Sequence, residues 1–291
     1  MLAISRILVP VDFSDRCLGM IPYVKAIAAK FGAEVVLLHV VNPFYTVPPT
    51  AFTAPAMIPL PQSAIPEREK SMVEFAVAEL EGVSTRRLVY EGDTTSQIAA
   101  LAKAENVSLI AMPTRGHGVL RRFLIGSETS KILHDVACPV LTGVHLDERP
   151  SPEPVRFSKV LCAVDLEAQS QPTLAWATQF AADFRAQLGI VHAITPVNSG
   201  VVVRLSADSQ MELEKIAREK IQKLQRATGA ESARVHLEEG EAARTVCSLA
   251  QSSGADLLVI GRGAAQEGET ERLRTNAYAI IRQSPCPVIS V

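Results

Sequence analysis

A strong net charge of either sign is missing from this sequence. Its 29 Lys and Arg residues nearly balance its 31 Asp and Glu residues, which leaves a formal net charge of −2. This balance gives no bulk attraction to nucleic acid or to an anionic membrane. The sequence also lacks a breaker-free apolar run of about 20 residues, and residues 1–12 show no signal-peptide pattern. We therefore expect a cytoplasmic protein with no nucleic-acid or membrane partner.

Cys-x-x-Cys pairs are also missing, and the cysteine count of five is odd. Free thiols are therefore expected rather than a disulfide framework. Cys138 and Cys286, each followed by proline, are interpreted as structural, because a free cysteine packs as a small hydrophobe. His39 and His192 have no metal-ligand spacing to Cys, Asp or Glu, so we predict no metal site and expect both rings to be hydrogen-bonded at strand ends. No catalytic residue is assigned.

The chain does contain an internal repeat. Residues 7–12 (Ile-Leu-Val-Pro-Val-Asp) return as residues 160–165 (Val-Leu-Cys-Ala-Val-Asp) at an offset of 153, and residues 138–140 (Cys-Pro-Val) return at an offset of 148. Other segments match between them in the same order, which indicates a tandem duplication. We place a first domain at 1–146, a proline-containing charged linker at 147–154 and a second domain at 155–291.

Each half alternates short apolar runs with longer helical patterns. In the first half the predicted strands are 6–11, 34–41, 85–90, 109–112 and 140–144, and the predicted helices are 16–31, 67–81, 95–105 and 127–136. Gly32 is expected to end the first helix and Ser96 to cap the third. The pattern predicts two doubly wound α/β domains, each with a five-stranded, mostly parallel sheet. In such sheets ligands bind beyond the carboxyl ends of the strands.

A candidate phosphate loop follows the fourth strand. It runs from Met112 through Gly116 to Gly126 and Ser127, where the last helix opens. A helix N-terminus favours anions, and Ser127 would cap the helix, bind a phosphate oxygen, or do both. The loop also carries Arg115, Arg121 and Arg122, but it is neither a Walker loop nor a Gly-x-Gly-x-x-Gly fingerprint. On its own, the loop is equally compatible with glycines that serve only as turn residues.

The whole array resembles the universal stress protein family, in a tandem form that covers nearly the entire chain. The resemblance rests on segments 8–14, 38–40, 92–93, 111–116, 126–127 and 138–140. It implies an adenine nucleotide alpha-hydrolase-like fold and an ATP site in the first domain, with Mg²⁺ as a possible companion. It also implies that Asp12 binds the ribose, that Pro10, Val40 and Met112 surround the adenine, and that Gly116, Gly126 and Ser127 meet the phosphates.

Two of these positions have alternative interpretations. Pro113 stands where the family pattern has its first glycine, so one N–H donor is lost there. Binding would weaken if that donor is needed and would survive if only a close approach matters. Asp12 would by itself be interpreted as a turn or cap residue at a strand end.

The second half departs further from the pattern. Arg274 and Thr275 stand where the first half has Gly126 and Ser127, and Glu267, Glu269 and Glu271 add negative charge. We predict no ordinary ATP site there. The alternative is that Arg262 or Arg274 binds another anion.

Residues 42–66 contain seven prolines and no charged residue. The prolines exclude a regular helix or a central strand, and we predict a long loop that serves as a lid over the ligand, as an apolar patch for a partner, or in no specific role.

The family resemblance further implies that the last strands, 139–144 and 287–291, pair within one chain, with a homodimer as a possible higher assembly. The function it implies is that of a stress-response protein that binds ATP as a sensor or adaptor, with at most slow ATP hydrolysis or autophosphorylation. The alternative is an interaction module that binds no nucleotide and acts through an unknown protein partner.

Overall fold

A computed structural model describes residues 2–47, 56–59, 64–114, 125–143, 154–194, 207–262 and 270–291. The first half contains β1 (Arg6–Pro10), α1 (Asp15–Phe31), β2 (Glu34–Val41), β3 (Phe44–Val47), β4 (Ala56–Pro59), α2 (Ala64–Glu74), β5 (Thr85–Glu91), α3 (Thr94–Ala104), β6 (Leu109–Pro113), α4 (Ser127–Asp135) and β7 (Val140–Gly143). The second half contains β8 (Lys159–Ala163), α5 (Ser170–Phe184), β9 (Gln187–Ile194), α6 (Ala207–Thr228), β10 (Arg234–Glu239), α7 (Ala242–Ser253), β11 (Leu257–Ile260), α8 (Thr270–Gln283) and β12 (Val288–Ser290).

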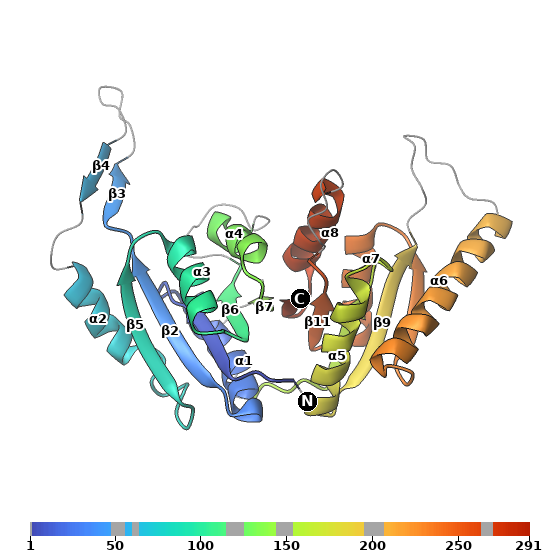
Figure 1. Cartoon of the computed structure of the whole chain (residues 1–291), viewed down its shortest axis with the longest axis horizontal. Coiled ribbons are helices and arrows are strands. Elements are labelled where there is room, and N and C mark those ends of the chain that lie inside the picture. Colours follow the sequence, from blue (N-terminus) through green and yellow to red (C-terminus); the bar gives the residue numbers. More distant parts are fainter. Residues whose placement is uncertain are drawn as a thin grey trace.

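The two halves share one continuous sheet. Its ten strands follow the order β10-β9-β8-β11-β12-β7-β6-β1-β2-β5, so the two expected five-stranded sheets meet edge to edge (Figure 1). The contact is the antiparallel pair β7–β12, in which Leu141 lies opposite Ile289. The predicted pairing of the last strands within one chain is therefore confirmed. It covers two apolar strand edges that would otherwise pair with other chains.

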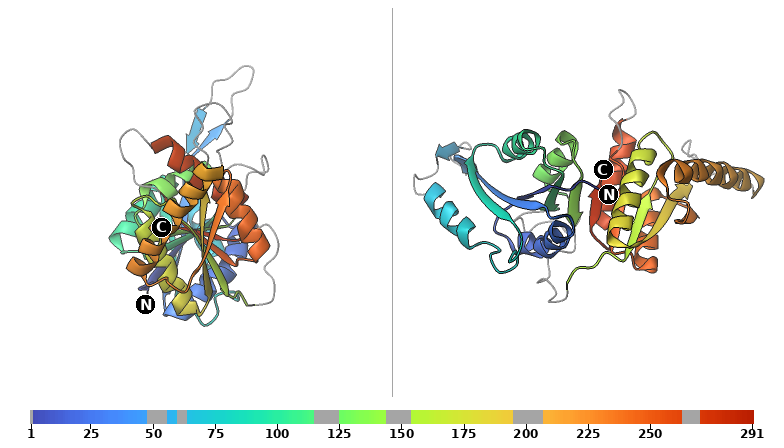
Figure 2. Two further views of the ribbon diagram at one scale, coloured as in Figure 1. Left: turned by 90° about the vertical axis from the view of Figure 1, so that its right-hand side faces the viewer. Right: turned by 60° about the horizontal axis from the view of Figure 1, so that its bottom comes forward.

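Helices cover both faces of the twisted sheet (Figure 2). Because successive side chains of a strand point to opposite faces, Ile7 and Val9 join the core beneath α1, α2, α5 and α6, whereas Leu8 joins the core beneath α3, α4, α7 and α8. The strand residues of both cores are almost fully buried. This explains why the predicted strands lack polar alternation.

Local signals set most helix ends. Ser14 caps α1 by accepting from the Cys17 N–H, and Gly32 ends that helix at a φ of 65°, as expected. The prediction for the third helix is wrong: Asp93, not Ser96, is its cap, and Asp93 accepts hydrogen bonds from the N–H and the hydroxyl of Ser96. An aspartate caps at least as well as a serine, and here it stands one residue before the helix begins.

The proline-rich segment differs from the expected unstructured loop. Residues 44–47 and 56–59 form an antiparallel two-stranded sheet outside the main one, which projects beyond β2 (Figure 1). Helix α2 begins at Ala64 rather than at residue 67 and ends at Glu74 rather than at residue 81. The remainder of residues 42–66 and most of the expected linker, residues 147–153, lie outside the described residues.

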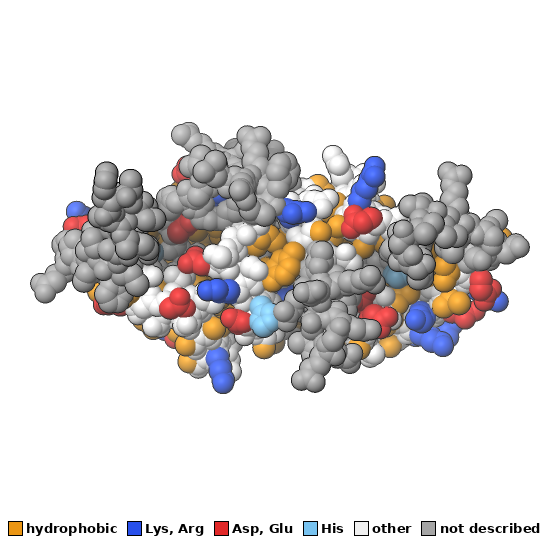
Figure 3. Space-filling model, turned by 90° about the horizontal axis from the view of Figure 1, so that it is seen from above, with side chains coloured by type: hydrophobic (Ala, Val, Ile, Leu, Met, Phe, Trp, Pro, Cys, Tyr) orange, Lys and Arg blue, Asp and Glu red, His pale blue; other side chains and the backbone are white. Residues whose placement is uncertain are grey.

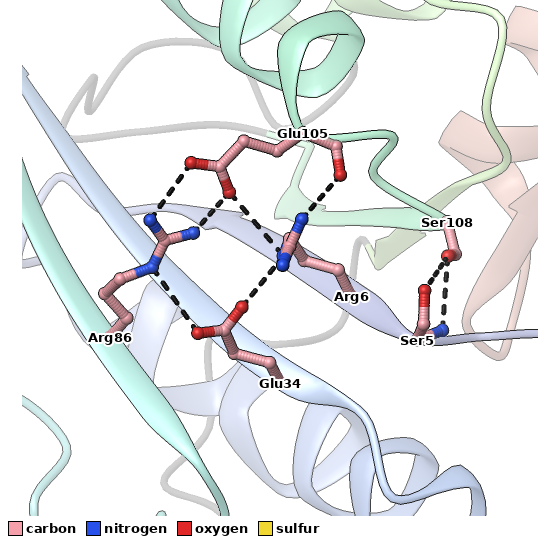
Figure 4. A network of polar contacts seen from close by, with 6 residues as sticks. All are labelled: Ser5, Arg6, Glu34, Arg86, Glu105 and Ser108. Atoms are coloured by element: carbon pink, nitrogen blue, oxygen red, sulfur yellow. Dashed lines mark hydrogen bonds and ion pairs between the residues drawn. The ribbon is translucent and has the colours of Figure 1, made fainter.

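A polar network lies at the amino ends of the first-half strands β1, β2 and β5 (Figure 4). Arg6 bridges Glu34 and Glu105, with its Nε 2.8 Å from Glu34 Oε2. Arg86 pairs with both carboxylates, and its hydrogen bonds to Glu105 hold the pKa of that carboxyl below its ordinary value. At the matching place in the second half, Lys159 donates to the carbonyl of Ser253 at 3.0 Å.

Candidate functional site

A cavity of about 220 Å³ lies at the carboxyl ends of β1, β2 and β6. Its walls include Pro10, Asp12, Val40 and Met112. These are four of the seven residues proposed for an ATP site, and they come from three different strand ends. The first turn of α4 completes the wall through Glu128 and Thr129. The structure thus brings together the positions that the family pattern assigns to the base and the ribose.

Asp12 is held in place by its own loop. Its Oδ1 accepts from the Ser14 N–H at 3.0 Å, the Ser14 hydroxyl at 2.6 Å and the Cys17 thiol at 2.9 Å. The bond from the N–H two residues on is the turn contact that the alternative interpretation of Asp12 expected. Asp12 therefore shapes the turn and lines the cavity.

The residue after this aspartate is strained in both halves. Phe13 has a φ of 60° and its counterpart Leu166 has a φ of 67°. Bulky residues seldom adopt this left-handed conformation, which costs about 1–3 kcal/mol. Phe13 packs its ring 4.6 Å from that of His39 and 5.7 Å from that of Phe75. The same strained turn at the same strand end places an aspartate in each cavity.

The helix that faces the first cavity begins at Gly126. The Gly126 N–H donates to the carbonyl of Thr114 at 2.9 Å, so this donor is already occupied. Ser127 is the first helical residue and makes no capping hydrogen bond, so its predicted cap role is wrong. The N–H groups of the first helical turn have no partner within the helix. Glu128 in that turn suits the helix dipole but would repel a phosphate.

Part of the candidate phosphate loop lies outside the described residues. It comprises Gly116, Arg115, Arg121 and Arg122.

Both strand-end histidines are hydrogen-bonded, as predicted. The Nδ1 of His39 lies 2.7 Å from the carbonyl of Val11, and the Nδ1 of His192 lies 2.9 Å from that of Val164. A carbonyl only accepts, so each Nδ1 carries a hydrogen and Nε2 of the neutral ring is an acceptor. Burial lowers the pKa of His39, which favours this neutral form.

The second half has a larger cavity of about 410 Å³ at the matching strand ends. Asp165 and His192 line it, as Asp12 and His39 line the first. Asp165 Oδ1 accepts from the Ser170 hydroxyl at 2.7 Å, the counterpart of the Cys17 contact. The repeated donor five residues after each aspartate is a signal that the sequence analysis missed.

Arg262 is committed to the contact between the halves. Its guanidinium donates to four carbonyls at the end of α4: Leu133 at 3.2 Å, Val136 at 2.8 Å, Ala137 at 3.3 Å and Cys138 at 2.9 Å. Beside it, the Tyr278 hydroxyl donates to the carbonyl of Ser130 at 3.0 Å. The suggestion that Arg262 binds an anion is therefore wrong. Glu267, Glu269 and the side chains of Glu271 and Arg274 lie outside the described residues.

All five cysteines are free thiols, as predicted. Burial raises the pKa of Cys17 to about 12, that of Cys247 to about 12 and that of Cys286 to about 11. Thiols of this kind are poor nucleophiles at neutral pH. Across the described ranges, no group of three His, Cys, Asp or Glu side chains is placed to hold a metal ion. Within those same ranges, no helix combines the length and apolarity needed to cross a membrane.

Comparisons with known proteins agree on one family. The model described as universal stress protein family matches residues 3–142 and again residues 156–291. The chain is 30% identical over 141 residues to universal stress protein MJ0531 of Methanocaldococcus jannaschii, a match that covers 47% of this chain and 80% of the relative. It is 28% identical over 141 residues to universal stress protein A homolog 1 of Coxiella burnetii, covering 47% of this chain and 97% of the relative.

A crystal structure of a universal stress protein from Archaeoglobus fulgidus shares the fold along the whole chain. Its TM-score is 0.71 at 21% identity, and the match covers 99% of this chain and 98% of that one. The predicted tandem α/β architecture is therefore confirmed.

Proposed function

Because the chain belongs to the universal stress protein family, we propose that its first half binds an adenine nucleotide, with ATP and Mg²⁺ as the expected ligand. One observation carries this proposal: the first cavity unites Pro10, Asp12, Val40 and Met112 beside the start of α4. The apolar strand ends suit a base, and the Asp12 carboxylate accepts from sugar hydroxyls. The helix N-terminus then faces the side on which phosphates would lie.

In this proposal the protein acts as a nucleotide-dependent sensor or adaptor in a stress response. No residue is assigned to catalysis, so bound ATP would be hydrolysed slowly at most. Ligand occupancy at the start of α4 would be transmitted through the far end of that helix, where Arg262 holds four carbonyls. The partner that reads this state would be a protein.

The alternative is an interaction module that binds no nucleotide. Two features favour it: Pro113 has no N–H to offer a phosphate, and the Gly126 N–H already donates to Thr114. An adaptor of this kind would work through its surface alone.

Titration calorimetry with Mg·ATP on the full chain separates these alternatives. The first-half site predicts one saturable binding event, which Gly126→Arg abolishes because a long cationic side chain then blocks the approach to the helix start. Ser130→Ala, on the same helix but away from the cavity lining, serves as the control and retains binding. Absence of ATP binding in the parent would reject the proposal and support the interaction module.

A further inference from the structure

The enlarged cavity of the second half occupies the same place in the fold as the first cavity. β8 and β9 pair with Ala163 opposite Val191, as β1 and β2 pair with Pro10 opposite Leu38. Yet the second cavity measures about 410 Å³ against about 220 Å³ for the first. Ligand pockets for small molecules usually span about 300–1,000 Å³, a range that the second cavity enters. In the view from above, hydrophobic side chains are visible on the right of the molecule, the side on which Figure 1 places α6 (Figure 3).

The extra volume comes from a consistent set of residue differences. Five lining positions of the first cavity are occupied by smaller, apolar residues in the second: Pro10 by Ala163, Val40 by Ala193, Thr94 by Ala242, Pro113 by Gly261 and Thr129 by Ala277. Each difference removes side-chain atoms, and the two threonine hydroxyls disappear. The cavity thereby becomes both wider and less polar.

Helix α6 adds an apolar wall to the second cavity. Leu213, Ile216, Ala217 and Lys220 line it from one face of the helix, at the spacing of successive turns. Ile216 remains 43% exposed. A bound apolar molecule would cover it, and that burial is worth about 25 cal/mol for each Å² removed from water.

The helix end that favours an anion in the first half is missing from the second. Helix α8 begins at Thr270, so residues 274–275, which match Gly126 and Ser127, already lie inside the helix. Their N–H groups, and those of the residues that follow, are bonded to carbonyls one turn earlier. The second cavity therefore faces the flank of a helix, whose amides have no donor to give a phosphate or carboxylate.

Asp165 and His192 bring hydrogen-bond acceptors to this cavity, beside the side-chain amides of Gln169 and Asn276. Oδ1 of Asp165 accepts from Glu167 and Ser170, whereas its other oxygen contacts no donor among the described residues. The Nδ1 of His192 donates to the carbonyl of Val164, so in the neutral ring its Nε2 is also an acceptor. A ligand that satisfies Asp165 and His192 must bring its own donors. Lys220 also lines this cavity and is exposed, as Asp165 is, so water screens the charges of both side chains.

From this juxtaposition we propose that the second half binds a non-anionic, mainly apolar small molecule that carries hydroxyl or amine donors. The apolar body lies between α6 and the shortened side chains of Ala193, Ala242 and Ala277, and the donors face Asp165 and His192. The site is separate from the nucleotide site proposed for the first half.

The test compares two probes of similar shape on the full chain. 2-Naphthol is neutral at neutral pH and has one donor, whereas 2-naphthoate is an anion without one. Ligand-observed NMR and calorimetry should show saturable binding of 2-naphthol that is tighter than that of 2-naphthoate by about tenfold, the cost of an unpaired or repelled group. Equal or tighter binding of 2-naphthoate would overturn the proposal, as would no binding of 2-naphthol.

Variants then locate the binding. Ala193→Val with Ala242→Thr restores the bulk of the first half and should weaken 2-naphthol binding by about tenfold through overpacking. Asp165→Asn keeps the Oδ1 acceptor and replaces the outer oxygen by a donor, so it should also weaken 2-naphthol. Ser248→Thr, on the exposed face of α7, should change nothing.

Unchanged 2-naphthol affinity in both pocket variants, each shown to melt like the parent, would contradict a second-half site. Mg·ATP binding should persist in these variants, so the two proposals fail independently.

Discussion

The two halves present different parts of a helix to the same strand ends. In the first half α4 starts at Ser127 and aims its first turn at the cavity, whereas in the second half α8 starts at Thr270 and passes the cavity side-on. The first arrangement provides amide donors and positive dipole, and the second provides neither. The comparison teaches that a duplicated fold changes the donors that it presents at the same strand ends by moving a helix start by a few residues, while the strained turn and its aspartate stay in place.

The contact between the halves gives the largest expected effect on stability. Arg262→Ala leaves four carbonyls at the end of α4 without their donor, and we expect a loss of about 3 kcal/mol in unfolding free energy, measured by urea denaturation. Thr114→Ala, at the matching first-half position, loses a single bond to the Gly143 carbonyl and should cost about 1 kcal/mol. An Arg262→Ala loss as small as that of Thr114→Ala would show that the guanidinium does not hold the halves together.

Pro113 offers a way to make the halves more alike. Pro113→Gly installs the second-half residue and supplies an N–H at the end of β6. We expect Mg·ATP to bind about fivefold more tightly, which corresponds to about 1 kcal/mol for one donor to a charged group. Pro113→Ala adds the N–H with less backbone freedom and should give part of the gain. Weaker binding in both variants, measured by calorimetry, would mean that the ring of Pro113 itself supports the base.

The polar network at the start of the first-half strands should make the stability of the protein sensitive to acid pH, an effect that belongs to the first half. The hydrogen bond from Arg86 holds the pKa of Glu105 below its ordinary value of 4.5. The stability that this depressed pKa contributes is present above pH 4.5 and is lost as the pH falls through the folded-state value. Because both side chains are partly exposed, we expect Glu105→Gln to cost about 1 kcal/mol at neutral pH and to reduce the acid sensitivity.

Denaturant unfolding between neutral and acid pH checks this effect. Glu69→Gln, at an exposed position on α2, is the control and should follow the parent at every pH. A Glu105→Gln protein with the parent's pH profile would exclude the network as the source of acid sensitivity.

The smallest effect is expected when a hydrogen-bond donor of the first half is replaced by its counterpart from the second half. Cys17→Ser replaces a thiol that donates to Asp12 by the hydroxyl that Ser170 uses toward Asp165. We expect a stability change below about 1 kcal/mol and no change in ATP affinity, whereas Cys17→Ala removes the donor and should weaken ATP binding. In the native parent, iodoacetamide should label Cys17 slowly, because burial raises the pKa of its thiol to about 12. Fast labelling would place this thiol outside the buried turn.

Much of the fold could be predicted from local patterns. The apolar run of β2 has the same bounds in sequence and structure, and the repeat offsets reproduce the strand registers of both halves. Apolar strands that are buried on both faces leave a strong signal in the sequence. The hairpin β3–β4 was missed because its prolines suppress strand patterns, although short paired strands at an edge tolerate proline.

The contents of the site were harder to predict. Four lining residues of the first cavity followed from the family pattern, but the donor Cys17 and the occupied N–H of Gly126 depend on loop geometry. The sequence carries one signal of the early start of α8: residues 270–283 contain neither glycine nor proline, so nothing in them interrupts a helix. Arg262 reaches carbonyls more than 120 residues away, and no local pattern records such a contact.

The central claim is that the first half alone faces its ligand with a helix start. Hydrogen exchange of the full chain, followed by mass spectrometry with and without saturating Mg·ATP, tests it directly. We predict slower amide exchange in residues 125–131 at the start of α4 and no change in residues 270–277 of α8. Protection of the α8 segment by ATP, alone or together with α4, would contradict the account.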